Sequence, residues 1–441
     1  MRIPTTIPYQ VHDKSAHENT ETMGLGLFHD LGLSHISGDI SISYHTPPID
    51  NATSTLKNPL HKALKAALDG LDTPVLTNLN LTSDILTTSF PEGYSIYPPL
   101  LLLPHNAFSS PPWTSLLALH PPQSPTLQPL WAHLATSMKT THIAINSPIP
   151  LTQSTSSNTL RSPINLTPIH GSFGPPPTPQ TLTSPTQHDF ATALWVSTVQ
   201  NGLHQTWAPL YTMFSRGNMR EKTRLMHLPS ATTPRRAAAA AVDMYAGIGY
   251  FAFPYRAAGL KPVVCFELNA WSVEGMRRGA RRNGWRVEVH GPGDALGVGR
   301  AVAHAAVDFH VFHMSNVEAP ACLARGPRIR HVNLGLLPCS RASWRDAVRL
   351  LDAEEGGWIH AHENVGVGEM RDRTVEIEGL FRAYVHELVG AGRMVGVEHV
   401  EKVKMYAPGV VHCVFDVKVG GKGANKGHQR DEENRSESVA S

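Results

Sequence analysis

One eleven-residue stretch, residues 242–252 (VDMYAGIGYFA), constrains the fold more than any other part of the sequence. An alanine-rich apolar run over 237–242 ends abruptly at Asp243, which predicts a buried strand followed by a turn. Gly247 and Gly249 permit backbone conformations that a side chain would forbid, and they let a ligand approach the main chain closely. The stretch therefore predicts a strand whose carboxyl end opens into a glycine turn.

The residues after this turn extend the pattern. Residues 250–258 are expected to form a helix, and the apolar run 261–266 (KPVVCF) predicts a second strand. That strand ends at Glu267, twenty residues after Gly247. Strand, glycine turn, helix, strand and acidic residue are the successive elements of a nucleotide-binding βαβ unit.

The side chains around the turn indicate which nucleotide is bound. The spacing of Gly247, Gly249 and Ala252 also fits the looser dinucleotide fingerprint, so an oxidoreductase is a competing interpretation. A carboxylate at Asp243 can hold an ammonium group but would repel a pyrophosphate. Glu267 can accept hydrogen bonds from both ribose hydroxyls. These features favour S-adenosylmethionine, and the adjacent residues Tyr245 and Asn269 are further candidate cofactor contacts.

Composition limits the class of protein. At 441 residues, two or three domains are expected. The formal net charge is only +2, so nucleic-acid binding would have to come from local patches. The four cysteines are scattered without a CxxC pair, which fits neither a disulfide framework nor a zinc site, and no metal is expected. No signal peptide or membrane span is recognisable, so a cytoplasmic protein is predicted.

Changes of composition along the chain predict five segments. Residues 1–93 form a variable Ser/Thr/Pro-rich N-terminal region, and residues 94–170 a small α/β domain. Residues 171–189 form a proline-rich linker in which 173–179 is expected to be extended and exposed. Residues 190–419 form a larger domain that contains the glycine turn, and residues 420–441 a disordered polar tail.

Two later strands carry further site candidates. Residues 308–314 (DFHVFHM) predict the third strand of a doubly wound sheet, and the polar Ser315 and Asn316 at its end are candidate contacts to adenine. A following strand ends near Asn333, in the segment NLGLLPCS. Many base-modifying methyltransferases have Asn-Pro-Pro-aromatic at this point, where the asparagine holds the amine of the target base. Here the asparagine is kept and the prolines are replaced. We therefore predict that the acceptor is bound by this segment, with its contacts at Asn333, Leu334, Gly335 and Pro338. Asn333 is the predicted catalytic residue, because its side chain would orient the acceptor.

A helix predicted at 270–283 carries arginines that share one face, among them Arg277, Arg278, Arg281 and Arg282. An unpaired arginine face would attract phosphates, whereas a solvated helix would need no partner. The sequence leaves both interpretations open.

Several segments resemble the tRNA wybutosine-synthesizing protein 2 family, the tRNA aminocarboxypropyltransferases related to the tRNA guanine-N1 methyltransferases. The matching segments occur in the family's order: TWAPLYTMFSRGNMREK, VDMYAGIGYFAFPY, HVNLGLLPCS, HAHENV and EKVKMYAPGVVHCVFDV. The resemblance implies a class I S-adenosylmethionine-dependent methyltransferase fold (Rossmann-like), an α/β doubly wound sheet behind a smaller N-terminal α/β domain.

The resemblance also implies the reaction. It would be transfer of the 3-amino-3-carboxypropyl group of S-adenosylmethionine to 4-demethylwyosine beside the anticodon of tRNA(Phe), with release of methylthioadenosine. By motif match, Ser215 and Lys222 would contact the cofactor, Glu267 its ribose, and Ser315 and Asn316 its adenine. Ser315 stands where the family usually has aspartate.

Three alternatives remain. A tRNA guanine-N1 methyltransferase of the same superfamily is disfavoured because Leu-Gly-Leu follows Asn333 in place of prolines. A dinucleotide oxidoreductase is disfavoured by Asp243. A non-catalytic tRNA-binding protein with a relic cofactor site is disfavoured because Asp243, Gly247, Gly249 and Glu267 are all present.

Overall fold

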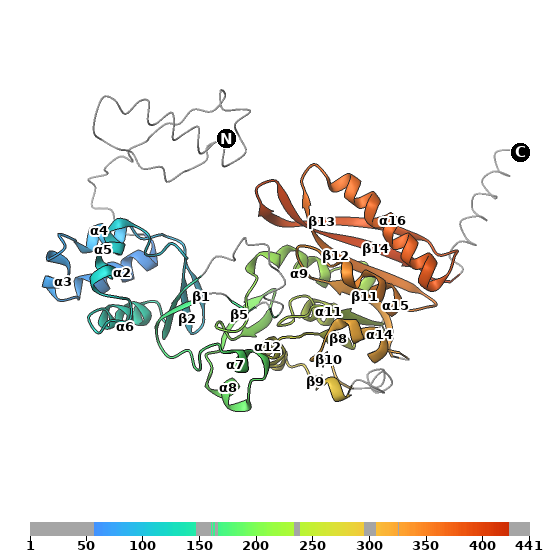
Figure 1. Ribbon diagram of the computed structural model, residues 1–441, viewed down its shortest axis with the longest axis horizontal. Coiled ribbons are helices and arrows are strands. Elements are labelled where there is room, and N and C mark those ends of the chain that lie inside the picture. The colour runs from blue at the N-terminus through green and yellow to red at the C-terminus, as the bar shows by residue number, and fades with distance from the viewer. Residues whose placement is uncertain are drawn as a thin grey trace, which may run out of the picture. The chain divides into compact units, whose positions relative to one another are not determined.

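The computed structural model describes residues 57–146, 160, 162–163, 166–232, 239–294, 306–324 and 326–422 (Figure 1). The N-terminal region up to 56, the tail after 422 and residues 295–305 lie outside the described residues. All described residues except Lys57 belong to one compact unit, residues 58–441.

An eight-stranded sheet forms the centre of the larger part of this unit, with strand order β13-β14-β12-β11-β7-β8-β10-β9. The strands are β7 (Ala239–Asp243), β8 (Val263–Phe266), β9 (Val287–His290), β10 (Phe309–Phe312), β11 (Arg328–Leu334), β12 (Gly356–Gly366), β13 (Val395–Ala407) and β14 (Val410–Gly420). Strands β9 to β12 with β7 and β8 are parallel, and β14 lies antiparallel between β12 and β13. The predicted doubly wound sheet is confirmed, and its order reverses between β7 and β11.

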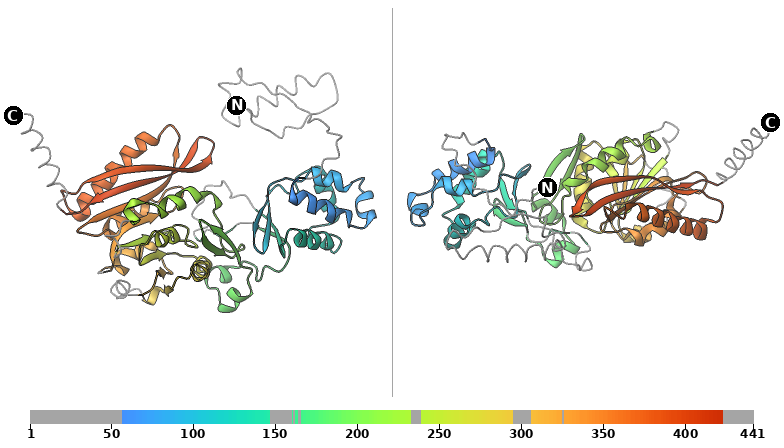
Figure 2. Two further views of the ribbon diagram at one scale, coloured as in Figure 1. Left: turned by 180° about the vertical axis from the view of Figure 1, so that it is seen from behind. Right: turned by 90° about the horizontal axis from the view of Figure 1, so that it is seen from above.

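Helices cover both faces of this sheet (Figure 2). They are α9 (Met219–Met226), α10 (Pro229–Thr232), α11 (Ala252–Ala257), α12 (Ala270–Arg282), α14 (Ala319–Cys322), α15 (Trp344–Leu350) and α16 (Met370–Val389). Side chains of α9, α11 and α12 share one hydrophobic core with the sheet, and those of α14, α15 and α16 share another. Alternation along each strand produces this division: Val311 of β10 joins the first core and its neighbour Phe312 joins the second.

A smaller sheet of order β1-β2-β3-β4 belongs to a second part of the chain, which we call the small domain (residues 58–170). Its strands are β1 (Ser95–Tyr97), β2 (Leu100–Leu103), β3 (His142–Ile145) and β4 (Thr167–His170), and its helices are α2 (Pro59–Asp69), α3 (Thr73–Thr77), α4 (Ser83–Thr88), α5 (Pro111–Leu119) and α6 (Gln128–Ser137). Leu60 and Leu64 of α2 share one core with Leu101 of β2 and Trp131 of α6. The small domain therefore includes residues 58–93, which the sequence analysis assigned to the N-terminal region. Because much of this stretch is rich in Ser and Thr, its composition did not indicate that it belongs to a folded domain.

The segment predicted as an exposed linker is exposed over most of its length, but aromatic side chains of the large domain (residues 171–422) hold it at three points. It contains α7 (Pro179–Thr183) and part of α8 (Gln187–Thr192), and it leads to the hairpin of β5 (Val196–Gln200) and β6 (Leu203–Trp207). Phe173 is buried, Tyr211 Oη donates to the carbonyl of Pro175 at 2.5 Å, and Trp271 Nε1 donates to that of Thr181 at 2.7 Å. Proline-rich backbone has free carbonyls, and here aromatic side chains of the large domain use them as acceptors.

Candidate functional site

The predicted site residues follow strand ends that lie along one edge of the large sheet. Asp243 closes β7, Glu267 follows β8, and Ser315 follows β10. In register, Asn333 of β11 stands beside Asp243 on β7. Because these strands are parallel, their carboxyl ends meet at one edge, which is where doubly wound sheets bind ligands.

The glycine turn brings its main chain against Glu267. Gly247 and Gly249 have φ angles of +54° and +91°, which favour glycine. Gly247 N donates to Glu267 Oε2 at 2.7 Å, and Asn269 N donates to Oε1 at 2.7 Å. The Glu267 carboxylate is thereby oriented, with lone pairs left to accept two hydroxyl groups. Burial raises the pKa of Glu267 above its usual range.

Asp243 is fully buried and only half satisfied. Its Oδ1 accepts a hydrogen bond from Tyr245 N at 3.2 Å, whereas Oδ2 has no partner among the described residues. Burial first, and then the charge of Glu267, raise the pKa of Asp243 to about 7. A buried carboxylate oxygen with no donor is suited to an incoming ammonium group.

Lys222 provides the opposite charge. It lies on α9, is 3% exposed, and its Nζ donates to Gln200 Oε1 at 2.7 Å and Gln205 Oε1 at 2.8 Å. The Nζ also lies 4.9 Å from the ring centroid of Tyr250. Burial lowers the pKa of Lys222 to about 7. Within the described part of the chain no carboxylate pairs with this ammonium, so it can receive an anion.

Two loops at this edge are held to the glycine turn by hydrogen bonds between a main-chain group and a side chain. Ser215 N donates to Tyr250 Oη at 3.2 Å, which fixes the loop before α9 against the glycine turn. Asn316 Nδ2 donates to the carbonyl of Met244 at 2.9 Å, which joins the end of β10 to the same turn. Ser315 is half-buried, and its Oγ accepts from Val317 N at 3.4 Å.

Two predicted contacts have side chains that are engaged elsewhere. Tyr245 Oη lies 2.5 Å from Ser343 Oγ. Asn269 Oδ1 accepts from Trp271 N at 2.9 Å and caps α12, while its Nδ2 donates to the carbonyl of Tyr211 at 3.2 Å. Asn269 therefore contributes to the site through its backbone N–H, which orients Glu267.

The predicted acceptor segment lies at the same edge, and Asn333 is enclosed there. Asn333 is fully buried, and its Nδ2 lies 3.4 Å from Tyr255 Oη. Its Oδ1 has no partner among the described residues. A Cβ on Gly335 would lie 2.8 Å from the Phe251 ring and 3.1 Å from that oxygen, so the close approach requires glycine. Leu334 is buried in the core, and Pro338 is exposed.

The sequence analysis did not identify the groups that surround Lys222. Gln200 and Gln205 lie on the two strands of the β5–β6 hairpin, and their amide oxygens converge only because the strands pair. No local pattern marks a glutamine as a lysine partner, so no sequence signal was available.

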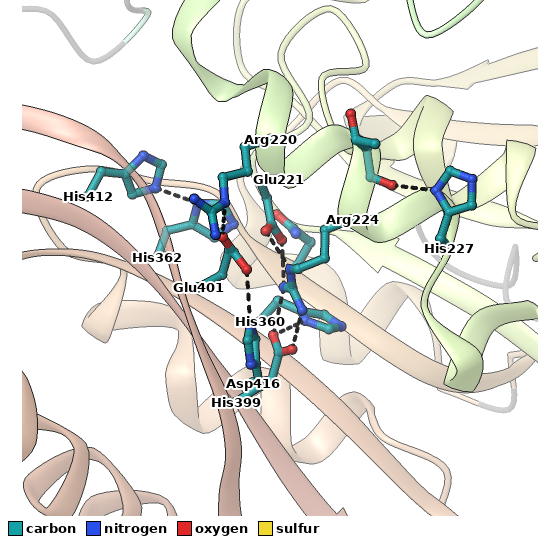
Figure 3. Close-up of polar contacts among 12 residues, drawn as sticks. Arg220, Glu221, Arg224, His227, His360, His362, His399, Glu401, His412 and Asp416 are labelled. Carbon is teal, nitrogen blue, oxygen red and sulfur yellow. Dashed lines mark hydrogen bonds and ion pairs between the residues drawn. The ribbon is translucent and has the colours of Figure 1, made fainter.

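A buried ionic network connects α9 to the sheet beside this site (Figure 3). Arg224 Nη1 donates to Asp416 Oδ2 at 2.5 Å, and its Nε donates to Glu221 Oε2 at 2.8 Å. His360 Nδ1 lies 2.6 Å from Asp416 Oδ1. A cavity of about 670 Å³ borders Arg224, His360, Asp416 and Trp358. Because the charged groups at its wall are mutually paired, we interpret the network as the support that positions α9, and with it Lys222.

One group of metal-ligand type lies elsewhere, on the edge strands. The ligand atoms of Glu288, His290 and His310 are all within 4.8 Å of one another. The sequence analysis expected no metal, and it did not anticipate that the pairing of β9 with β10 would gather these three residues.

Within the described ranges, no helix combines the length and apolar character needed to cross a membrane. Of the arginines predicted to share a face on α12, Arg277 and Arg278 both pair with Glu274. Arg281 and Arg282 are exposed.

Comparison with known proteins identifies close relatives. No protein-family model matches the sequence. The chain is 38% identical over 334 residues to the tRNA wybutosine-synthesizing protein 2 of Schizosaccharomyces pombe, covering 74% of this chain and 72% of the relative. It is 30% identical over 427 residues to the protein of the same name in Saccharomyces cerevisiae, covering 88% and 87%. The crystal structure of P. horikoshii TYW2 in complex with MeSAdo has a similar fold, with a TM-score of 0.50, 17% identity, and coverage of 82% of this chain and 99% of that one.

Proposed function

The chain belongs to the tRNA wybutosine-synthesizing protein 2 family, and we propose that it transfers the 3-amino-3-carboxypropyl group of S-adenosylmethionine to 4-demethylwyosine in tRNA(Phe), releasing methylthioadenosine. The observation that carries this proposal is the pair of buried, unpaired charges at one sheet edge, the Asp243 carboxylate and the Lys222 ammonium. The transferred group carries an ammonium and a carboxylate, which complement these two charges.

The residues fit S-adenosylmethionine group by group. Asp243 Oδ2 would accept from the α-ammonium, and Lys222 would hold the carboxylate. Glu267 would accept from the ribose hydroxyls, in front of the main chain of Gly247 and Gly249. The adenine would lie by the end of β10, at Ser315 and Asn316.

Holding the amino acid end selects the reaction. A sulfonium has three electrophilic carbons, and the one that reacts is the one in line with the nucleophile. Fixing both charges of the methionine moiety aims its γ-carbon at the acceptor. The new bond joins that carbon to the acceptor atom of the base, the γ-carbon–sulfur bond breaks, and the acceptor atom gives up its proton to water. Methylthioadenosine leaves as a neutral thioether, so no acid is required for its departure.

A tRNA guanine-N1 methyltransferase would use the same fold and cofactor. The segment after Asn333 supports the aminocarboxypropyltransferase, because Leu334 is buried and Gly335 is closed against Phe251 where the methyltransferases carry prolines. The family membership of the chain supports the same choice.

The finer assignments of partner and compartment are also proposals. We propose that the small domain and the exposed arginines Arg281 and Arg282 bind tRNA phosphates, in which case affinity would fall steeply with salt. We propose cytoplasmic action, a location supported by the four free cysteines.

Two labelled cofactors test the reaction. One carries the label on the S-methyl and the other on the methionine carboxyl, and each is incubated with the protein and with tRNA from cells that lack this step. Carboxyl label in tRNA without methyl label is expected. Methyl label would establish a methyltransferase. Binding of the cofactor without transfer of either label would indicate a relic site.

A further inference from the structure

Several buried polar atoms without partners lie on the side of the large sheet that α9 covers, near the carboxyl ends of its parallel strands. Both side-chain atoms of Asn364, Nε2 of His362 and Nδ1 of His412 are buried and have no hydrogen-bond partner among the described residues. A polar atom that is buried without a hydrogen-bond partner destabilises the folded state. Proteins commonly retain such atoms where a bound ligand supplies the missing hydrogen-bond partner.

Strand register places these groups in one row. Asn364 of β12 pairs with His412 of β14, and His412 pairs with Lys404 of β13. His362 lies two residues before Asn364 on the same strand face, with its Nδ1 3.0 Å from His412 Nε2 (Figure 3). We call these four residues, Asn364, His362, His412 and Lys404, the polar row.

The polar row adjoins the predicted acceptor segment. The His362 ring lies 4.8 Å from the Phe251 ring, which in turn closes against Gly335. Asn364 N donates to the carbonyl of Pro338 at 2.9 Å. The row therefore extends the line of strand ends that begins at Asp243 and Asn333, on the side away from Glu267.

The imidazole pair has a fixed hydrogen-bonding character. Burial lowers the pKa of His362 well below its usual value and that of His412 to about 4, so both rings are neutral near neutral pH. One proton is shared between the facing nitrogens. Whichever ring donates it, one outer nitrogen is a donor and the other an acceptor. The Asn364 amide adds one further donor group and one acceptor, which together match the edge of a heteroaromatic base.

Lys404 supplies a charge beside these groups. Its Nζ would lie 2.8 Å from a Cβ on Gly217, so the lysine packs over the Ser-Arg-Gly-Asn loop before α9. Among the described residues no carboxylate lies within ion-pair distance of this ammonium, and burial lowers its pKa. A half-buried cation at the edge of a polar row is suited to a phosphate.

We propose that the polar row is the subsite for the acceptor nucleotide, with Asn364 and the His362–His412 pair binding the edge of the base and Lys404 binding an adjoining RNA phosphate. The assignment rests on the proposed function, because it presumes a nucleotide in RNA as the acceptor. Asn364 would then help to determine which base is accepted, although it lies on β12 and outside the predicted acceptor segment.

Steady-state transfer of carboxyl label to tRNA tests the subsite with Asn364→Ala. We expect kcat/KM for tRNA to fall by about tenfold or more, since a base contact is lost. KM for S-adenosylmethionine should stay within about twofold, and the melting temperature should not fall, because the free protein loses only an unsatisfied amide. Unchanged turnover would overturn the proposal. So would a combined fall in melting temperature and cofactor affinity, which indicates a structural role.

Lys404→Ala tests the phosphate contact. We expect a higher KM for tRNA and a salt slope that is smaller by about one. Lys418→Ala is the matched control, since Lys418 lies on the neighbouring strand and pairs with Glu398 at 2.6 Å. Equal effects of the two substitutions would contradict the assignment.

Failure of the proposed function can be separated from failure of the subsite. If the wild-type protein transfers no carboxyl label, the function is wrong. The subsite is then tested by the affinity for an anticodon stem-loop that contains 4-demethylwyosine. Weaker binding by Asn364→Ala than by wild type would support the subsite, and equal binding would overturn it.

Discussion

Lys222 and Asp243 are two buried side chains whose pKa values are shifted to about 7 from opposite directions. The proposed contacts need both groups charged. Lys222 is charged below about pH 7, and Asp243 is charged above it. We therefore expect the affinity for S-adenosylmethionine to be bell-shaped with its maximum near pH 7, and to approach about a tenfold loss per pH unit on each limb.

Calorimetric titration of the cofactor between about pH 5 and pH 9 measures this profile. Lys222→Met is expected to lower the affinity at the maximum and to abolish the alkaline limb while leaving the acid limb. A profile that is flat in the wild-type protein, or one that Lys222→Met leaves unaltered, would show that these residues do not bind the charged ends of the cofactor.

The Asp243 carboxylate is also expected to destabilise the free protein. Its folded pKa of about 7 exceeds the ordinary value of 3.8, so the folded state binds the proton more tightly than the unfolded state. Stability therefore falls as pH rises from about 4 to 7, and the full penalty of a few kcal/mol applies above about pH 7. Without cofactor, Asp243→Asn should be more stable than wild type at about pH 8 and similar near pH 4.

Urea denaturation at the two pH values tests this expectation. The same variant should lose cofactor affinity, because a neutral amide replaces the partner of the α-ammonium. A variant that is less stable than wild type at the higher pH would mean that Asp243 is needed for folding rather than for binding.

At the residue scale, local pattern predicted the groups that directly follow a strand. Asp243 and Glu267 stand where apolar runs end, and the glycines between them mark the turn. The partners of Lys222 and the polar row could not be predicted in this way. They meet through pairing of β5 with β6 and of β12 with β14 and β13, and no short stretch of sequence encodes that register.

At the scale of elements, Arg224 fastens α9 to β14 by pairing with Glu221 and Asp416. Removing the arginine leaves the buried Glu221 carboxylate without a counter-charge and leaves Asp416 only its contact with His360. Arg224→Ala is therefore expected to lower the free energy of unfolding by about 3–5 kcal/mol. It should also raise KM for S-adenosylmethionine, because α9 carries Lys222.

Arg220→Ala is the control for the loss of the Arg224 ion pairs. Arg220 lies on the same helix and pairs with Glu401, but its side chain is 68% exposed, so a loss below about 1 kcal/mol is expected. Denaturant unfolding of both variants provides the comparison. Similar losses would show that burial of the Arg224 pairs adds nothing to stability.

The predicted elements were most accurate where their signals are periodic. The helix expected at 270–283 is α12 (Ala270–Arg282), and the strand expected at 261–266 is β8 (Val263–Phe266). The membership of residues 58–93 in the small domain and the contacts of residues 171–189 with the large domain were not predicted. Both are decided by contacts with distant residues, such as Trp131 for the first and Trp271 for the second.

At the scale of the whole molecule, the small domain has its own core, separate from the two cores of the large sheet. A smaller hydrophobic cluster contains residues of both domains, such as Leu100 of the small domain and Trp207 of the large domain, and Tyr97 packs against it. Scanning calorimetry of the full chain is therefore expected to show two transitions. A cofactor that binds only the large domain should shift only one of them.

The expected shift follows from mass action. At about one hundred times its dissociation constant, S-adenosylmethionine should stabilise the large domain by about 2.7 kcal/mol and raise that transition by several degrees. Trp113→Ala, in the core of the small domain, should lower the other transition, because a fully buried indole is removed. If the cofactor raised both transition temperatures together, the cluster around Trp207 would couple the two domains into one cooperative unit. Cofactor binding would then stabilise the small domain as well.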